Sequence, residues 1–147
     1  MNDENSVGLT VRKLNSAIRR DIERTNSLKG VNAKGVHGWA IKYFHDNKEK
    51  DIYQRDFEEK FAIRRSTATQ FLKTMEKNGL IKRESVDSDA RLKKIILTDR
   101  AEDILKFIED DIKKREKLMR EGISEKELNT FFNVSKKIIS NLEDRND

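Results

Sequence analysis

The segment from Ile63 to Thr98 constrains the fold more than any other part of the chain. Within Arg65–Asn78, apolar residues recur at three- and four-residue steps, so they share one stripe of a helix that can pack on a core. The stripe consists of Ala68, Phe71, Leu72 and Met75. Asn78-Gly79 is expected to end this helix, because glycine adopts the left-handed conformation that follows a helix C-terminus without a steric penalty.

Two short strands are predicted directly after this helix. Leu80–Glu84 and Lys93–Leu97 contain β-branched residues, and the polar residues 85–91 between them are typical of a hairpin tip. Ile52 is expected to add a one-residue strand partner to the hairpin. The pattern therefore predicts a helix followed by a two-stranded wing.

Positive charge is concentrated on the same segment. Residues 60–94 contain ten Lys or Arg and four Asp or Glu, a net charge of +6, whereas the whole 147-residue chain has a net charge of +5. Such an excess is typical of a surface that binds a polyanion, and a helix fits a DNA major groove, which is about 12 Å wide. We therefore expect nucleic acid as the partner, and a solvated charged face is the alternative.

A short helix is predicted immediately before the basic one. Gln54–Phe61 places two phenylalanines four residues apart on one face, and residues 62–64 connect it to Arg65–Asn78 as in a helix-turn-helix. Gln54 and Arg55 lie at the N-terminus of this helix, where backbone N–H groups and the helix dipole favour anions. They are candidate phosphate contacts, and the alternative is a solvent-exposed helix start.

A set of short motifs between Ile52 and Thr98 is specific enough to indicate a family. The motifs are Ile52–Glu58, Arg65–Thr69, Leu72, Met75–Ile81, Arg83, Asp89-Ala90-Arg91 and Leu97-Thr98. Together they resemble the winged helix-turn-helix core of the multiple-antibiotic-resistance regulator (MarR) family. The resemblance implies a mainly α-helical protein with a small β wing, in which N- and C-terminal dimerisation helices flank the winged core.

The resemblance also implies roles for individual residues. The helix with the Arg-Ser-Thr-x-Thr motif corresponds to the recognition helix, and Arg91, oriented by Asp89, corresponds to a wing arginine that enters a minor groove. The predicted DNA-binding residues are Arg64, Arg65, Ser66, Thr67, Thr69, Gln70, Lys73, Asp89, Arg91 and Lys93. Two positions depart from the family pattern. Arg64 replaces a Ser or Thr and is expected to exchange a helix cap for a phosphate contact, and Ala101 replaces a Gly.

Amphipathic helices are predicted on both sides of the winged core. One runs from Leu9 or Thr10 to about Thr25, one runs from Asp99 to about Glu121 with Thr98 as its cap, and the last begins at the capping box of residues 124–127. Because 40% of the residues are charged and the mean hydropathy is −0.88, a monomer has little core. These helices are therefore expected to pack on a second subunit, and a self-contained three-helix packing is the alternative.

The predicted dimer interface contains Leu14, Ile18, Ile112, Met119, Phe131, Ile138 and Leu142. The whole chain is predicted to be a single domain. Its DNA-binding lobe is expected at about residues 32–98, and its dimerisation helices are expected at about residues 9–28 and 99–143.

One further helix is predicted from a cap at Asn32 to about Asn47, and it is rich in aromatic residues. The MarR resemblance implies a cleft for small aromatic or anionic effectors beside this helix, and its candidate lining residues are His37, Trp39 and Tyr43. Aromatic residues at helical spacing also form cores, which is the alternative here. The sequence identifies no particular effector.

Enzymatic, metal-binding and membrane functions are not predicted. The chain has no cysteine, and His37 and His45 are eight residues apart, which places them about 12 Å from each other on a helix. Hydrolase, phosphate-loop and zinc-protease motifs are absent. We therefore predict no catalytic residue, no metal and no cofactor. The chain also lacks an apolar run near 18 residues and a signal-peptide pattern, which predicts a cytoplasmic protein.

Charge, helix pattern and resemblance together predict a sequence-specific transcription regulator. It is expected to bind double-stranded DNA as a homodimer at a pseudo-palindromic operator, acting as a repressor, with a small-molecule effector as a further candidate partner. The alternative is a small helical interaction module whose basic wing binds RNA or an acidic protein.

Overall fold

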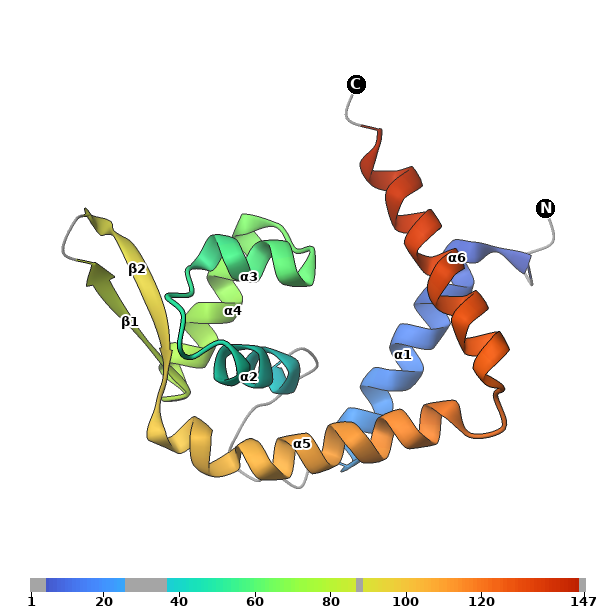
Figure 1. The fold of residues 1–147 in the computed structure, drawn as a ribbon, viewed down its shortest axis with the longest axis horizontal. Coiled ribbons are helices and arrows are strands. Elements are labelled where there is room, and N and C mark those ends of the chain that lie inside the picture. Colours follow the sequence, from blue (N-terminus) through green and yellow to red (C-terminus); the bar gives the residue numbers. More distant parts are fainter. Residues whose placement is uncertain (1–4, 26–36, 87–88, 146–147) are drawn as a thin grey trace. The chain divides into compact units, whose positions relative to one another are not determined.

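The computed structural model describes residues 5–25, 37–86 and 89–145 (Figure 1). In chain order the elements are α1 (Val7–Thr25), α2 (His37–Asp46), α3 (Gln54–Phe61), α4 (Arg65–Lys77), β1 (Ile81–Val86), β2 (Asp89–Leu97), α5 (Asp99–Arg120) and α6 (Glu125–Glu143). The chain divides into two compact units, residues 1–109 and residues 110–147, and the boundary falls within α5. The prediction of a mainly α-helical fold with a small β wing is confirmed.

The wing is an antiparallel pair of strands that is longer than the sequence predicted. Its register runs from Ile81 opposite Leu97 to Ser85 opposite Lys93, and an irregularity follows between Ser85 and Val86. Leu80, expected in the first strand, lies just before it, whereas Asp89–Arg91, expected in the tip, belong to β2. The polar residues are in the strands because backbone ladder bonds do not depend on side-chain polarity.

A third segment extends the wing by a single bridge. Tyr53 pairs with Lys94, and the Ile95 N–H donates to the Ile52 carbonyl over 2.7 Å. The prediction of a one-residue strand partner is therefore correct in kind, but the paired residue is Tyr53 rather than Ile52. This bridge attaches the start of α3 to the middle of β2.

The core of the first unit lies between α2, α3, α4 and the base of the wing. The stripe predicted on α4 is buried at Ala68, Leu72 and Met75. The fully buried ring of Phe57 stacks on Phe71 with the ring centroids 5.2 Å apart. Aromatic rings with such offsets attract each other beyond the effect of burial alone, so this cluster fixes how α3 packs on α4.

Two left-handed residues shape the helix-turn-helix and the approach to the wing. Ala62 has φ 50°, and the Ile63 N–H donates to the Glu58 carbonyl over 3.1 Å, which turns the chain sharply from α3 to α4. Gly79 has φ 71° and follows the end of α4, as predicted. The Thr98 hydroxyl then donates to the Gly79 carbonyl and accepts the Ala101 N–H, so Thr98 both caps α5 and holds the base of the wing.

In the second unit, a capping box begins α6 as the sequence predicted. The Ser124 hydroxyl accepts the Glu127 N–H over 3.2 Å, and the Glu127 carboxylate accepts the Ser124 N–H over 2.8 Å. This backbone hydrogen bond to the carboxylate lowers the pKa of Glu127 below its ordinary value of 4.5. Gly122, with φ 74°, follows α5 in the position expected for a helix stop.

The predicted starts of α1 and α2 can be compared with the structure. The first helix begins at Val7, two or three residues earlier than expected, and ends at Thr25. The helix predicted from Asn32 is described only from His37, so the Asn32 cap lies outside the described residues. Among the helices that the structure describes, none has the length and apolar content needed to cross a membrane.

Candidate nucleic-acid interface

The exposed face of α4 carries the residues predicted to read DNA. Ser66, Gln70 and Lys73 are spaced four and three residues apart, are all exposed, and lie opposite the buried stripe of the same helix. Thr67 and Arg65 are exposed beside them, and Thr69 is partly buried. An exposed polar helix face of this kind can offer hydrogen-bond donors and acceptors to base edges in a major groove.

The start of α4 has no side-chain cap. Arg64 occupies the N-cap position with an extended backbone (φ −71°, ψ 153°), and its side chain makes no capping hydrogen bond. The Arg64 side chain is exposed. The replacement of a Ser or Thr by Arg64 was expected to remove the helix cap, and the structure has no such cap. The phosphate contact of Arg64 stays a prediction.

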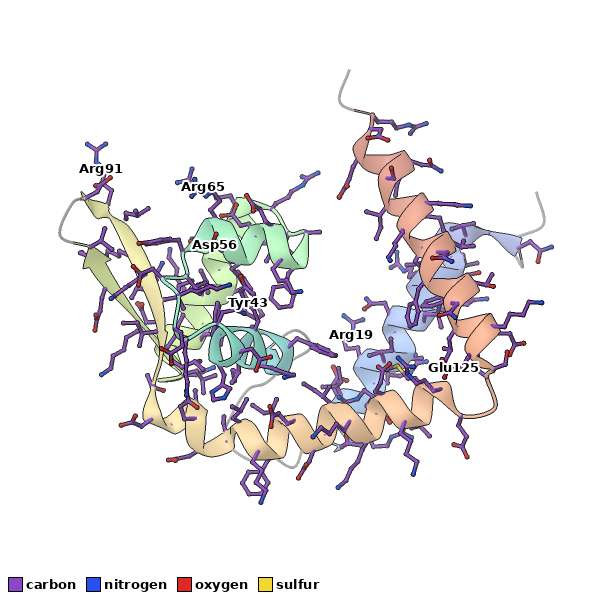
Figure 2. The ribbon with its side chains drawn as sticks, in the orientation of Figure 1. Arg19, Tyr43, Asp56, Arg65, Arg91 and Glu125 are labelled. Atoms are coloured by element: carbon purple, nitrogen blue, oxygen red, sulfur yellow. The ribbon has the colours of Figure 1, made fainter. Side chains whose placement is uncertain are left out.

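Arg91 is exposed on β2, near the end of the wing. The Asp89 carboxylate accepts the backbone N–H of Arg91 over 2.9 Å, so Asp89 orders the backbone from which Arg91 projects. In Figure 2 the side chains of Arg65 and Arg91 both extend from the first unit on the side away from the start of α5. Arg91 and α4 thus present positive charge on a common side.

A groove of about 470 Å³ connects α3, α4 and the wing. Its lining residues are Tyr53, Gln54, Arg55, Glu58, Arg65, Thr69, Arg83, Arg91, Leu92 and Lys93. Five of these ten side chains are basic and one is acidic. A concave surface with this charge concentrates the local positive potential, which suits it to the sugar-phosphate backbone of a nucleic acid.

The groove includes residues that the sequence did not assign to the site. Tyr53 directly precedes α3, Glu58 lies within α3, and Arg83 lies in β1. Arg83 was noted only as part of the family motif, and its place in the groove depends on the register of β1 against β2. The strand register was not predictable from charge, so the charge pattern alone could not separate Arg83 from its basic neighbour Lys82.

Hydrogen bonds within the interface join α3 to α4. The Gln54 Nε2 donates to the Thr69 hydroxyl over 2.9 Å and approaches the Arg65 carbonyl at 3.4 Å. The Thr69 hydroxyl itself donates to the Arg65 carbonyl over 2.8 Å. Gln54, predicted as a phosphate contact, is therefore also part of the contact between the two helices.

Two of the three candidate effector residues, Tyr43 and Trp39, lie in different environments. Tyr43 packs edge-on against Phe61 with ring centroids 5.8 Å apart, and burial raises the pKa of Tyr43, with smaller contributions from the Asp56 and Glu59 carboxylates. Trp39 is 49% exposed. The side chain of His37 lies outside the described residues. Tyr43 thus belongs to the aromatic core, which was the alternative to an effector site.

His45 and the neighbouring Lys42 each contact a carboxylate. The His45 Nδ1 lies 2.7 Å from the Glu102 Oε2, and the Lys42 ammonium lies 2.8 Å from the Asp46 carboxylate. The hydrogen bond to Asp46 raises the pKa of Lys42. In the described ranges, no group of three or more His, Asp or Glu side chains is arranged to hold a metal ion.

Apolar side chains predicted at a dimer interface are accessible on their helices. The side chains of Leu14, Ile18, Met119, Phe131 and Leu142 are exposed, and those of Ile112 and Ile138 are partly exposed. Leu142 is 65% exposed, the largest value among these residues. Exposed apolar side chains at helical spacing in both units are typical of a surface that another chain covers.

Part of the chain matches a family of known proteins, and solved structures share its fold. Residues 47–93 match the MarR family. The transcription regulator MarR from Oenococcus oeni PSU-1 is 25% identical, with 91% of this chain and 96% of that chain covered and a TM-score of 0.68. The heme sensor protein PefR from Streptococcus agalactiae, solved in complex with heme, is 25% identical, with 99% of each chain covered and a TM-score of 0.67. MepR from S. aureus, solved as a complex with DNA, shares the fold at 17% identity, with 97% and 98% covered and a TM-score of 0.74.

Proposed function

We propose that this chain is a transcription regulator of the MarR family, as the match of residues 47–93 supports, and that it binds double-stranded DNA sequence-specifically as a homodimer. In this proposal α4 enters the major groove, and its exposed residues Ser66, Gln70 and Lys73 face the base edges. Arg91 reaches into the flanking minor groove from the wing. The single observation that carries the proposal is the basic groove between α3, α4 and β2, which joins the recognition helix and the wing into one positive surface.

The remaining assignments follow from the same arrangement. Residues 32–98 are proposed as the DNA-binding lobe, and residues 9–28 and 99–143 as the dimerisation helices. A two-fold dimer presents two copies of α4, so the operator is proposed to be pseudo-palindromic. Occlusion of a promoter by such a dimer makes repression the proposed outcome. No catalytic role is proposed, because family membership and the exposed basic surface both point to binding.

The experiment that tests this function is selection of bound duplexes from a random pool. The proposed function predicts enrichment of one sequence with two inverted half-sites. Enrichment without a consensus, or a preference for RNA over duplex DNA, would instead support the interaction module with a basic wing. The same pool screened at several salt concentrations separates sequence-specific binding from general phosphate attraction.

A further inference from the structure

A side-chain hydrogen bond between α3 and α4 involves Thr69, a residue of the proposed recognition helix. The Gln54 side chain lies between the Thr69 hydroxyl, 2.9 Å away, and the Arg65 carbonyl, 3.4 Å away. Because a backbone carbonyl only accepts hydrogen bonds, the Gln54 atom that faces both groups is its amide nitrogen. The contact joins residues 15 positions apart and therefore sets the geometry of one helix relative to the other.

The hydroxyl of Thr69 has little hydrogen-bonding capacity left for DNA. A hydroxyl has one donor and two acceptor lone pairs. The Thr69 donor is used by the Arg65 carbonyl at 2.8 Å, and one lone pair is used by the Gln54 amide. Thr69 is also partly buried, whereas Ser66 and Gln70 beside it are exposed.

The Gln54 contact supports the first turn of α4, which no side-chain cap stabilises. Arg64 supplies no side-chain cap, so the N-terminal turn lacks the hydrogen bond that a Ser or Thr would give. Gln54 reaches the first helical residue, Arg65, and the residue one turn later. Its amide thus anchors the part of the helix whose exposed face is proposed to meet the bases.

We infer that Gln54 is a positioning residue for the recognition helix, and that it holds the Thr69 hydroxyl within the protein rather than leaving it to read a base. This inference rests on the proposed function and deepens it. Hydrogen bonds to base edges need donor–acceptor distances near 3 Å, whereas attraction to phosphates falls off slowly with distance. A displaced α4 would therefore lose sequence discrimination before it loses general affinity for DNA.

The test is Gln54→Met, which keeps the length of the side chain and removes its donor. Because one hydrogen bond contributes a modest net free energy, affinity for the selected operator is expected to fall about two- to tenfold. Affinity for an unrelated duplex of the same length is expected to fall by a smaller factor. Thr69→Val removes the same contact from the α4 side, and it is expected to give the same loss with the same preferred bases. The double variant is expected to lose less than the sum of the two single losses, since both substitutions remove the Gln54–Thr69 hydrogen bond.

The matched control is Gln70→Met, the same substitution on the exposed face of α4. It is expected to change the preferred base at one operator position, which neither Gln54→Met nor Thr69→Val should do. Thermal unfolding of each variant shows whether it is folded. If Gln54→Met does not fold, Thr69→Val still tests the same contact.

Three results would overturn the inference while leaving the proposed function intact. A changed base preference in Thr69→Val would show that its hydroxyl reads DNA. Equal losses on operator and unrelated duplexes in Gln54→Met would identify Gln54 as a phosphate contact, and fully additive losses in the double variant would show two separate interactions. If the wild type enriches no duplex, the proposed function fails together with the inference.

Discussion

The Arg83 guanidinium lies 2.9 Å from the Glu76 carboxylate and so connects β1 of the wing to the last turns of α4. The Arg83 side chain is only 22% exposed but also lines the basic groove, so its charge is shared between an internal partner and the proposed DNA surface. The ion pair fixes the wing against the recognition helix, and it also cancels one positive charge in the groove. A substitution of Glu76 can separate the structural effect of this ion pair from its effect on the charge of the groove.

Glu76→Gln is expected to strengthen binding to any duplex without changing the preferred bases. Its amide oxygen still accepts the Arg83 hydrogen bond, whereas the negative charge is removed. If Arg83 in each subunit then neutralises one more phosphate, the slope of log affinity against log salt should steepen by about 0.9 per subunit. Salt titrations of wild type and variant on operator and unrelated duplexes measure this. A weaker affinity with an unchanged slope would show that the carboxylate is needed to hold the wing.

Binding of the wild type is expected to depend strongly on salt. Six basic residues in or next to the proposed interface occur twice in a dimer, namely Arg64, Arg65, Lys73, Arg91, Lys93 and Lys94. If about 6–10 phosphates are neutralised, affinity should fall roughly 10³–10⁵-fold between about 50 and 200 mM salt. Fluorescence anisotropy over this range measures the slope, and a flat titration would contradict the electrostatic interpretation of the groove.

Arg91 and Gln70 are expected to have different effects on specificity. Arg91→Ala should weaken binding to every site, and most where the flanks are A·T-rich, because a narrow minor groove is strongly negative. Gln70→Ala should instead change which base is preferred within the half-site, since glutamine pairs with base edges. Both variants are measured against a panel of single-base operator variants. Unchanged affinity in Arg91→Ala, or a uniform loss in Gln70→Ala, would reject this division of roles.

Helix boundaries were predictable from sequence where short-range signals set them. The structure begins α3 at Gln54 and α4 at Arg65, as predicted, because turn residues and apolar spacing act within a few positions. The wing was longer than predicted, since residues such as Ser85 and Arg91 are held in strands by a partner strand rather than by their own propensity.

Contacts between residues far apart in the sequence limited how much of the candidate site could be predicted. The basic residues of the interface could be chosen from charge and resemblance, but the pairing of Gln54 with Thr69 joins positions on two helices. Nothing in either local sequence specifies that pairing, because it depends on the packing of Phe57 against Phe71. Long-range geometry of this kind follows from the complete core and not from a motif.

The capping box of α6 predicts a pH-dependent contribution to stability. The pKa of Glu127 is lowered in the folded state, so its stabilising effect is present above its ordinary pKa of 4.5 and is lost as the pH falls through the lower folded-state value. Glu127→Gln keeps an acceptor without this titration. The difference in unfolding free energy between wild type and Glu127→Gln should therefore shrink between about pH 6 and about pH 3, measured by urea unfolding. A difference that is constant with pH would show that the carboxylate contributes nothing through its charge.

The exposed end of α6 gives the sharpest test of the proposed dimer. Leu142 is 65% exposed in the single chain, so Leu142→Asp should leave the isolated fold intact, but an unpaired charge in an apolar interface costs several kcal/mol. Sedimentation should then show a monomer for Leu142→Asp and for Ile138→Asp. The matched control is Asn141→Asp, which introduces the same charge at the neighbouring exposed residue and should leave the dimer unchanged.

The spacing of the operator half-sites is expected to follow from the same dimer. A two-fold dimer places two copies of α4 on one DNA face, which requires half-sites about one helical turn apart, near 10 bp and 34 Å. Inserting about 5 bp rotates one half-site to the far side of the duplex, so wild-type affinity should fall towards the non-specific level. Leu142→Asp should bind the original and the spaced operator equally weakly, because a monomer does not sense spacing. A wild type that sediments as a monomer, yet binds one half-site as tightly as the palindrome, would show that the exposed apolar residues of α1, α5 and α6 serve another purpose.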